Sequence, residues 1–184
     1  SISKEYDKTT MGAATVTGFA VYNDEDVFAT VDAVFDSADA GSHSVNLSNW
    51  QLGGVDSGKY ALPDDLPTSA TGAITPADYT ALVGTAQELL PGSGLSAITV
   101  TAATTGVGGE AVAGSLAWFS DGSRSVPAVD SDLSGLNKGE NVTLYWSFTS
   151  TDGNYVPTPK TGYTAFIATN PSHAAPAAPT AEHV

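Results

Sequence analysis

The 184-residue chain contains no cysteine, so disulfide bonds, thiolate metal sites and cysteine nucleophiles are excluded together. Basic residues are scarce: six lysines and arginines stand against 20 aspartates and glutamates, which gives a formal net charge of −14. A field of that sign repels phosphate backbones and anionic lipid head groups, so we expect no nucleic-acid partner. No apolar run approaches the roughly 18–20 residues of a membrane span, so we expect no direct membrane insertion.

Patterns typical of β-strands dominate the sequence. Residues 12–31 alternate β-branched or aromatic residues with small ones around the polar turn 23–26, which predicts a β-hairpin. Only residues 75–83 show helix-start signals, with Thr75 as N-cap and Pro76 at the first helical position. The segment is too short to support any fold class but all-β. Further period-two runs lie at 44–47, 97–100, 142–148 and 163–167.

An internal repeat divides the chain near residues 76–80. Residues 45–47 (Val-Asn-Leu) return at 142–144 (Val-Thr-Leu), and a turn that ends in Tyr60 returns as one that ends in Tyr155. The offsets are 97 and 95 residues (142 − 45 and 155 − 60), and the order is unchanged. Two copies of one module would produce this pattern.

The first half carries motifs of a known family. The segment Lys4-Glu5-Tyr6-Asp7-Lys8-Thr9-Thr10 resembles the K-x-Y-D-G-T-T opening of the YDG repeat, which is found in bacterial surface proteins and adhesins. The resemblance continues in order through the turns and strands at 24–27, 35–41 and 52–62. Lys8 stands where the family usually has glycine and Lys59 where it usually has asparagine.

In the second half, residues 114–118 and 148–155 resemble the companion Ig-like (MBG-type) repeats of such surface proteins. These resemblances imply two tandem all-β modules, either small Ig-like β-sandwiches or β-grasp-like folds, at 1–78 and 79–170. The Ala/Pro-rich residues 171–184 are expected to form a linker to the next domain. We expect the chain to be a piece of a longer array that is secreted and anchored at the cell surface, with neighbouring domains of the same chain as its partners.

The resemblance implies no catalytic residues, and the sequence offers none. His173 and His183 lie in the expected linker, and no G-x-S-x-G motif accompanies His43. The function we expect is therefore that of a non-catalytic spacer or stalk in an adhesin-like protein. The alternative is a binding module that contacts a glycan or a host protein through acidic turns and two candidate aromatics, Trp50 and Tyr22.

Two acidic turns are candidate metal sites. Asp24, Glu25 and Asp26 lie in the first, and Asp36 and Asp39 lie in the second. Clustered carboxylates could coordinate Ca²⁺, although neither turn has EF-hand spacing. We favour solvated acidic turns that keep strand edges apart by repulsion, and expect no cofactor.

The turn at 56–60 has the D-x-G-x-Y motif that recurs in the family it resembles, and the related turn at 152–155 (Asp-Gly-Asn-Tyr) also ends in tyrosine. Tyr60 and Tyr155 should each lay the ring on a core and bond through the hydroxyl to a main-chain group. Trp118 and Trp146, in apolar strands, are expected in a core. Lysines such as Lys4 are expected to be exposed, so no Lys–Asn isopeptide cross-link is predicted.

Overall fold

The computed structural model describes residues 2–16, 22 and 24–169, and the expected linker at 171–184 lies outside them. The described part consists of β-strands with one short helix, α1 (Ser131–Ser134), which confirms the all-β class. It divides into two compact units. Unit 1 comprises Ser1–Thr80, Thr104–Gly114 and Ser150–Thr158, and unit 2 comprises Ala81–Ala103, Ser115–Thr149 and the chain from Pro159 onward.

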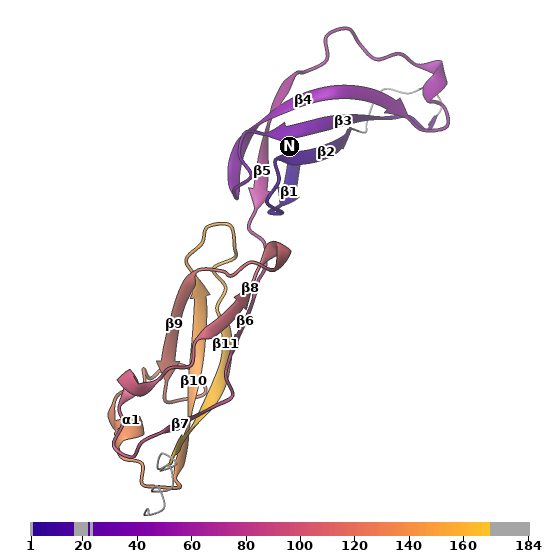
Figure 1. Ribbon diagram of the computed structural model, residues 1–184. Helices are drawn as coiled ribbons and strands as arrows, with labels where there is room; N and C mark the ends of the chain where they lie inside the picture. The colour runs from indigo at the N-terminus through magenta and orange to yellow at the C-terminus, as the bar shows by residue number, and fades with distance from the viewer. Residues whose placement is uncertain (1, 17–21, 23, 170–184) are drawn as a thin grey trace, which may run out of the picture. The chain divides into compact units, whose positions relative to one another are not determined.

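A curved five-stranded sheet forms the body of unit 1 (Figure 1). β1 runs parallel to β5, and the other neighbours are antiparallel. The predicted hairpin within 12–31 is confirmed as β2 and β3, although its residues 17–21 and 23 lie outside the described residues. The strands, in the sheet order β1-β5-β4-β3-β2, are β1 (Ile2–Glu5), β5 (Ser69–Thr75), β4 (Gly41–Gly53), β3 (Phe28–Phe35) and β2 (Met11–Val16).

The core of this sheet follows the two-residue period of its strands. Alternate side chains of β3 point to the buried face, and β4 and β5 add apolar side chains to the same layer. The buried residues are Ala29, Val31, Ala33, Phe35, Val45, Leu47 and Ile74.

The sheet curls until its two edge strands, β1 and β2, are joined by Lys4. The Lys4 ammonium group donates to the carbonyl oxygens of Met11 (2.8 Å) and Thr9 (2.9 Å) and pairs with Asp7. Its side chain is only 13% exposed, so the expectation of an exposed lysine is wrong here. Carbonyl and carboxylate oxygens replace the water that the ammonium group loses.

A β-bulge in β4 precedes Trp50. The pairing register with β3 shifts between Thr30 and Asp32, opposite Asn49, which has a φ of 54°. Asparagine tolerates this left-handed conformation, and the Asn49 amide donates to the Asp32 carboxylate at 2.8 Å. Trp50 is half-buried, and its indole N–H donates to the carbonyl of Pro67 at 3.2 Å.

Unit 2 contains a four-stranded sheet in the order β7-β11-β10-β9, and two further strands pair with each other as β6-β8. The core contains Leu89, Leu133, Leu144 and Phe166. Trp118 packs edge-on against Phe166, which confirms its expected place at a core. The strands are β6 (Thr80–Val83), β7 (Ala86–Leu89), β8 (Ala102–Thr105), β9 (Gly114–Phe119), β10 (Asn141–Ser150) and β11 (Lys160–Ala168); Trp146, on β10, is also buried.

The helix signals at residues 75–83 are misleading. β5 ends at Thr75, β6 begins at Thr80, and between them Ala77 forms a parallel bridge with Tyr155. The backbone N–H and C=O of Ala77 are thereby used by a distant strand end, so local propensity is overridden by tertiary pairing.

The two larger sheets share one plan, as the internal repeat predicts. In each, a short early strand (β1 or β7) runs parallel to the last strand (β5 or β11). That last strand is antiparallel to the strand before it, β4 or β10. The two tyrosine turns lie between these last two strands in both sheets.

Candidate functional site

Tyr155 is the centre of a group of buried contacts in unit 1. The residue is 2% exposed, and its ring lies edge-on to Tyr6 (5.6 Å between centroids) and Tyr79 (6.2 Å). Its hydroxyl accepts the backbone N–H of Val107 at 2.9 Å and donates to the Glu110 carboxylate at 2.6 Å. The predicted bond from this tyrosine to the main chain is therefore confirmed.

An ion pair closes the outer side of this group. Lys8 contacts the second carboxylate oxygen of Glu110, so one carboxylate serves both Lys8 and Tyr155. The bond from Lys8, followed by that from Tyr155, lowers the pKa of Glu110. Burial, followed by the bond to the anionic Glu110, raises the pKa of Tyr155 to about 12. The phenol is therefore held neutral beside a carboxylate held ionised.

Asn154, the residue before Tyr155, binds the turn that follows β3. Its carbonyl oxygen accepts the backbone N–H of Ala40 at 2.7 Å, and its amide donates to the Asp39 carboxylate at 3.1 Å. The same turn is fixed by His43, whose ring nitrogens contact Asp36 at 2.9 Å and the Asp39 carbonyl at 2.7 Å. The turn therefore presents one donor and one acceptor, which match the two ends of the Asn154 amide.

Two backbone anchors complete the group. Ala77 donates to the carbonyl of Asn154 and accepts from the N–H of Val156, both at 2.9 Å. The Tyr79 hydroxyl accepts the buried N–H of Ser150 at 3.1 Å. We call the set of Lys8, Glu110, Asn154 and Tyr155, with Tyr6 and Tyr79 packed against it, the Tyr155 hub.

Gly106 leaves the space that the hydrogen bond between the Val107 N–H and the Tyr155 hydroxyl needs. A Cβ placed on Gly106 would overlap the hydroxyl oxygen of Tyr155. Only a residue without a side chain at this position lets the hydroxyl reach the N–H of Val107.

The other tyrosine turn repeats the arrangement. The Tyr60 hydroxyl accepts the backbone N–H of Tyr22 at 2.9 Å and donates to the Glu25 carboxylate at 2.6 Å. In both turns the carboxylate lies three residues after the backbone donor (25 − 22 and 110 − 107). The carboxylate again pairs with a lysine, here Lys59 at 2.7 Å. We call Tyr22, Glu25, Lys59 and Tyr60 the Tyr60 corner.

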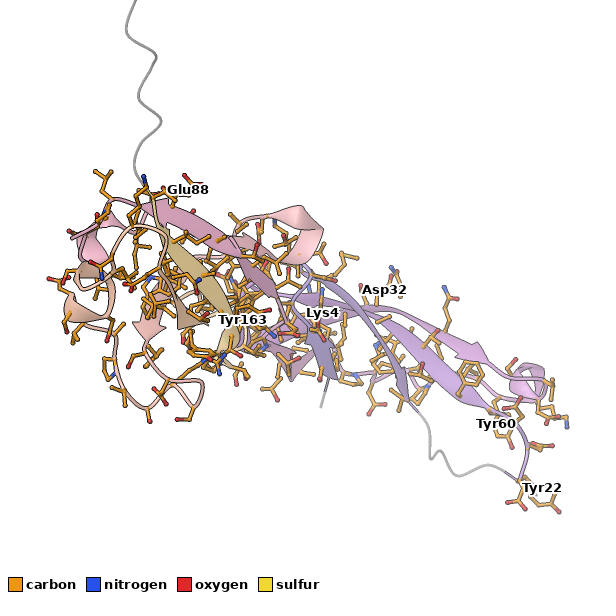
Figure 2. All side chains as sticks on the ribbon, turned by 90° about the horizontal axis from the view of Figure 1, so that it is seen from below. Lys4, Tyr22, Asp32, Tyr60, Glu88 and Tyr163 are labelled. Carbon is orange, nitrogen blue, oxygen red and sulfur yellow. The ribbon has the colours of Figure 1, made fainter. Side chains whose placement is uncertain are left out.

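Within unit 1 the Tyr60 corner lies far from Lys4, at the other end of the sheet, and Figure 2 shows Tyr22 and Tyr60 together there. Tyr60 is half-buried, whereas the Tyr22 side chain is 73% exposed. The bond from Lys59, followed by that from Tyr60, lowers the pKa of Glu25. The corner is thus a more open version of the hub.

The two acidic turns lie at opposite ends of β3 and do not form one site. In the first, Glu25 belongs to the Tyr60 corner, and the Asp26 carboxylate accepts the N–H of Val55 at 3.2 Å. Asp24 has a φ of 56° and is exposed. The second turn, with Asp36 and Asp39, belongs to the surroundings of the hub. In residues 2–16, 22 and 24–169, no three metal-binding side chains come together.

The two candidate aromatic residues, Trp50 and Tyr22, make different contacts. The Trp50 indole N–H donates to the carbonyl of Pro67. Tyr22 donates its backbone N–H to the Tyr60 hydroxyl, and its side chain is exposed to solvent. Among the described residues, no helix is long and apolar enough to cross a membrane.

The sequence analysis missed Glu110, Asn154 and the pairing of Lys8. Glu25 and Glu110 are 85 residues apart (110 − 25), which departs from the repeat offsets of 95 and 97. In both turns the carboxylate lies three residues after the backbone N–H that bonds to the tyrosine hydroxyl. This spacing could have identified Glu110, but it can be recognised only when the residue that donates to the tyrosine is already known.

No curated protein and no solved structure matches the chain. The family model described as "YDG domain" matches residues 1–72. This range contains the Lys4–Thr10 motif and all five strands of the first sheet except the last residues of β5. No match identifies the Ig-like module expected after it. Residues 1–72 are therefore similar to YDG domains, over less than half of the chain.

Proposed function

We propose that the chain is a non-catalytic spacer, a stalk segment of a secreted bacterial surface protein that holds other domains of that protein away from the cell. The observation that carries this proposal is the Tyr155 hub. It bonds the first sheet to the loops between β8 and β9 and between β10 and β11 through a buried aromatic side chain.

A spacer must hold its segments in a fixed arrangement, and the hub has the properties required. Its bonds come from side chains, backbone and ring contacts at once, so several must break before the loops can move. A buried tyrosine with two hydrogen bonds is also a costly group to expose to solvent. The cysteine-free, acidic composition is compatible with a surface protein but does not favour any ligand.

The proposal is tested by measuring a distance within unit 1. Spin labels at Ser48→Cys and Thr151→Cys occupy two exposed positions, and no native cysteine competes for the label. We expect a single narrow distance distribution by pulsed electron paramagnetic resonance. Tyr155→Ala and Asn154→Ala should each broaden it, because each removes bonds between the sheet and the loops.

Tyr60→Ala is the matched control, because it removes the equivalent tyrosine at the corner and should leave this distribution narrow. A broad distance distribution in the protein with an unchanged hub would contradict the spacer proposal.

A second test displays a ligand-binding domain on the surface of a bacterium, joined to the cell by either this chain or a Gly/Ser linker of equal length. We expect the natural chain to extend the reach of capture with no change in ligand specificity.

A further inference from the structure

We propose that the Tyr60 corner is a docking surface for a second YDG-type module, which would contact it as residues 6–8 and 39–40 contact Glu110, Asn154 and Tyr155. This inference rests on the proposed spacer function and adds its partner. The occupant is a module that presents a segment equivalent to Tyr6-Asp7-Lys8 and a turn equivalent to Asp39-Ala40.

The first argument is the repeated bonding pattern. Tyr60 and Tyr155 each accept a backbone N–H and donate to a carboxylate three residues beyond that donor. Both follow a turn in which the tyrosine N–H bonds to the carbonyl three residues earlier, Ser57 or Asp152. The two surfaces are therefore built alike down to individual atoms, and one of them already carries a YDG-type module.

The second argument is the difference in cover. Tyr155 is 2% exposed because Tyr6 and Tyr79 lie against its ring. The Tyr60 corner has no described equivalent of Tyr6, and its Tyr22 side chain is 73% exposed. Val55, whose N–H bonds to Asp26 next to Glu25, is 87% exposed. Large apolar side chains beside a half-buried tyrosine provide the area that a docked module would cover.

The third argument is charge complementarity. Lys59 stands immediately before Tyr60, as Asn154 stands before Tyr155, and Asn154 donates to the Asp39 carboxylate. A lysine at that place would form an ion pair with the same carboxylate of an arriving module. The module's own Lys8 would then pair with Glu25, as Lys8 pairs with Glu110 in the hub.

The docking exchanges the two ion pairs of Lys59 within the corner for two ion pairs between the modules. Without a partner, Lys59 lies on Glu25 and Asp56, both at 2.7 Å, and its side chain is 59% exposed, so it is free to turn outward. In the docked state Lys59 contacts the incoming aspartate, and the incoming lysine replaces it on Glu25. Asp56 gives up its ion pair with Lys59 and keeps the bond that its carboxylate accepts from the N–H of Asp26 at 3.0 Å.

The experiment uses the complete chain with a second copy of residues 1–80 fused ahead of it. A Gly/Ser linker of about 30 residues gives an average reach of about 30 Å without fixing an orientation. Asp39→Cys in the added copy and Lys59→Cys in the complete chain form the reporting pair, and the protein has no other cysteine. We expect this pair to form a disulfide at least about tenfold faster than a pair in which Ser48→Cys replaces Lys59→Cys.

Three further variants calibrate the cross-linking rate and test its dependence on charge. Asp39→Cys with Asn154→Cys, both in the complete chain alone, reports the contact that the structure shows and calibrates the rate. Glu25→Lys in the complete chain should slow the cross-link between modules, and Lys8→Glu in the added copy should restore it. A merely flexible tether would not respond to this charge exchange.

Cross-linking no faster than with the Ser48→Cys control would overturn the docking proposal, as would an added copy that stays unfolded beside an intact corner. Binding of a glycan array that is lost in Tyr22→Ala, without cross-linking, would assign the corner to a sugar instead. The spacer proposal is judged on the spin-label distances of the complete chain, so either proposal can fail while the other stands.

Discussion

The Tyr155 hub and the Tyr60 corner use the same four groups, a tyrosine hydroxyl, a backbone N–H, a carboxylate and a lysine, in two different settings. In the corner the lysine is the tyrosine's own neighbour in sequence, Lys59. In the hub it is Lys8, more than a hundred residues before Glu110. The corner therefore joins two chain segments, because its lysine comes from the turn of the tyrosine, whereas the hub joins three, because its lysine comes from a separate segment.

Burial decides how much each version contributes to stability. The Tyr155 ring is enclosed by two other aromatic rings, whereas Tyr60 keeps contact with solvent. Water can replace a lost bond at the corner but not at the hub. Equivalent substitutions should therefore lower the free energy of unfolding more at the Tyr155 hub than at the Tyr60 corner.

The largest expected difference comes from removing each ring. Tyr155→Ala should lower the free energy of unfolding by about 3–5 kcal/mol, because it leaves a cavity between Tyr6 and Tyr79 and strands the N–H of Val107. Tyr60→Ala should cost clearly less, because its ring is half-buried. Urea unfolding of the two variants, followed by circular dichroism, measures both. Equal losses would show that the hub is no more important than the corner.

The sequence predicted this comparison only in part. Period-two alternation identified β2, β3, β10 and β11, because alternate residues are buried in β3, β10 and β11 and half-buried in β2. The Asp/Gly turns at 56–60 and 152–155 identified the two tyrosines and their bonds to the main chain.

What sequence could not predict are the choices made by tertiary pairing. The helix signals at Thr75 and Pro76 were overridden when Ala77 paired with Tyr155. Lys4 was buried by the curling of the sheet, which no local pattern encodes. Glu110 and Lys8 are joined across a hundred residues, so neither residue alone signals the pair.

A smaller effect should come from filling the space that the central bond needs. Gly106→Ala places a Cβ against the Tyr155 hydroxyl and should lower the free energy of unfolding by about 1–3 kcal/mol. Gly153→Ala is the matched control, since a Cβ there would meet nothing within 4 Å and the residue has no positive φ. We expect it to stay within about 0.5 kcal/mol of the parent protein. The same urea titration compares them, and a neutral Gly106→Ala would mean that the bond to Val107 is dispensable.

Alkaline pH should distinguish the hub by the titration of Tyr155. Its pKa is raised to about 12 by burial and by the bond to Glu110, against about 10 in an unfolded chain. Because the folded pKa is the higher, the contribution is complete below about pH 10 and is lost as the pH rises through about 12. Unfolding free energies measured across that window should fall with pH, and the fall should be shallower in Tyr155→Phe. An unchanged slope in that variant would place the alkaline loss elsewhere.

The smallest expected effects come from replacing Lys8 of the hub and Lys59 of the corner. Lys8→Met and Lys59→Met each remove an exposed cation from a carboxylate–tyrosine pair, so both should change stability little at moderate salt. Their effects on the spin-label distances should differ, because Lys8 bonds to the loop between β8 and β9, whereas Lys59 bonds only to residues of the Tyr60 corner and to Asp56. We expect Lys8→Met to broaden the distribution between Ser48→Cys and Thr151→Cys slightly, and more at low salt, where the ion pair it removes is least screened. Lys59→Met should leave the distribution as it was. If neither substitution changes the spin-label distance distribution, the loops of unit 1 are held to its sheet by Asn154 and the aromatic rings alone. The ion pair of Lys8 would then serve only to hold Glu110 ionised beside Tyr155.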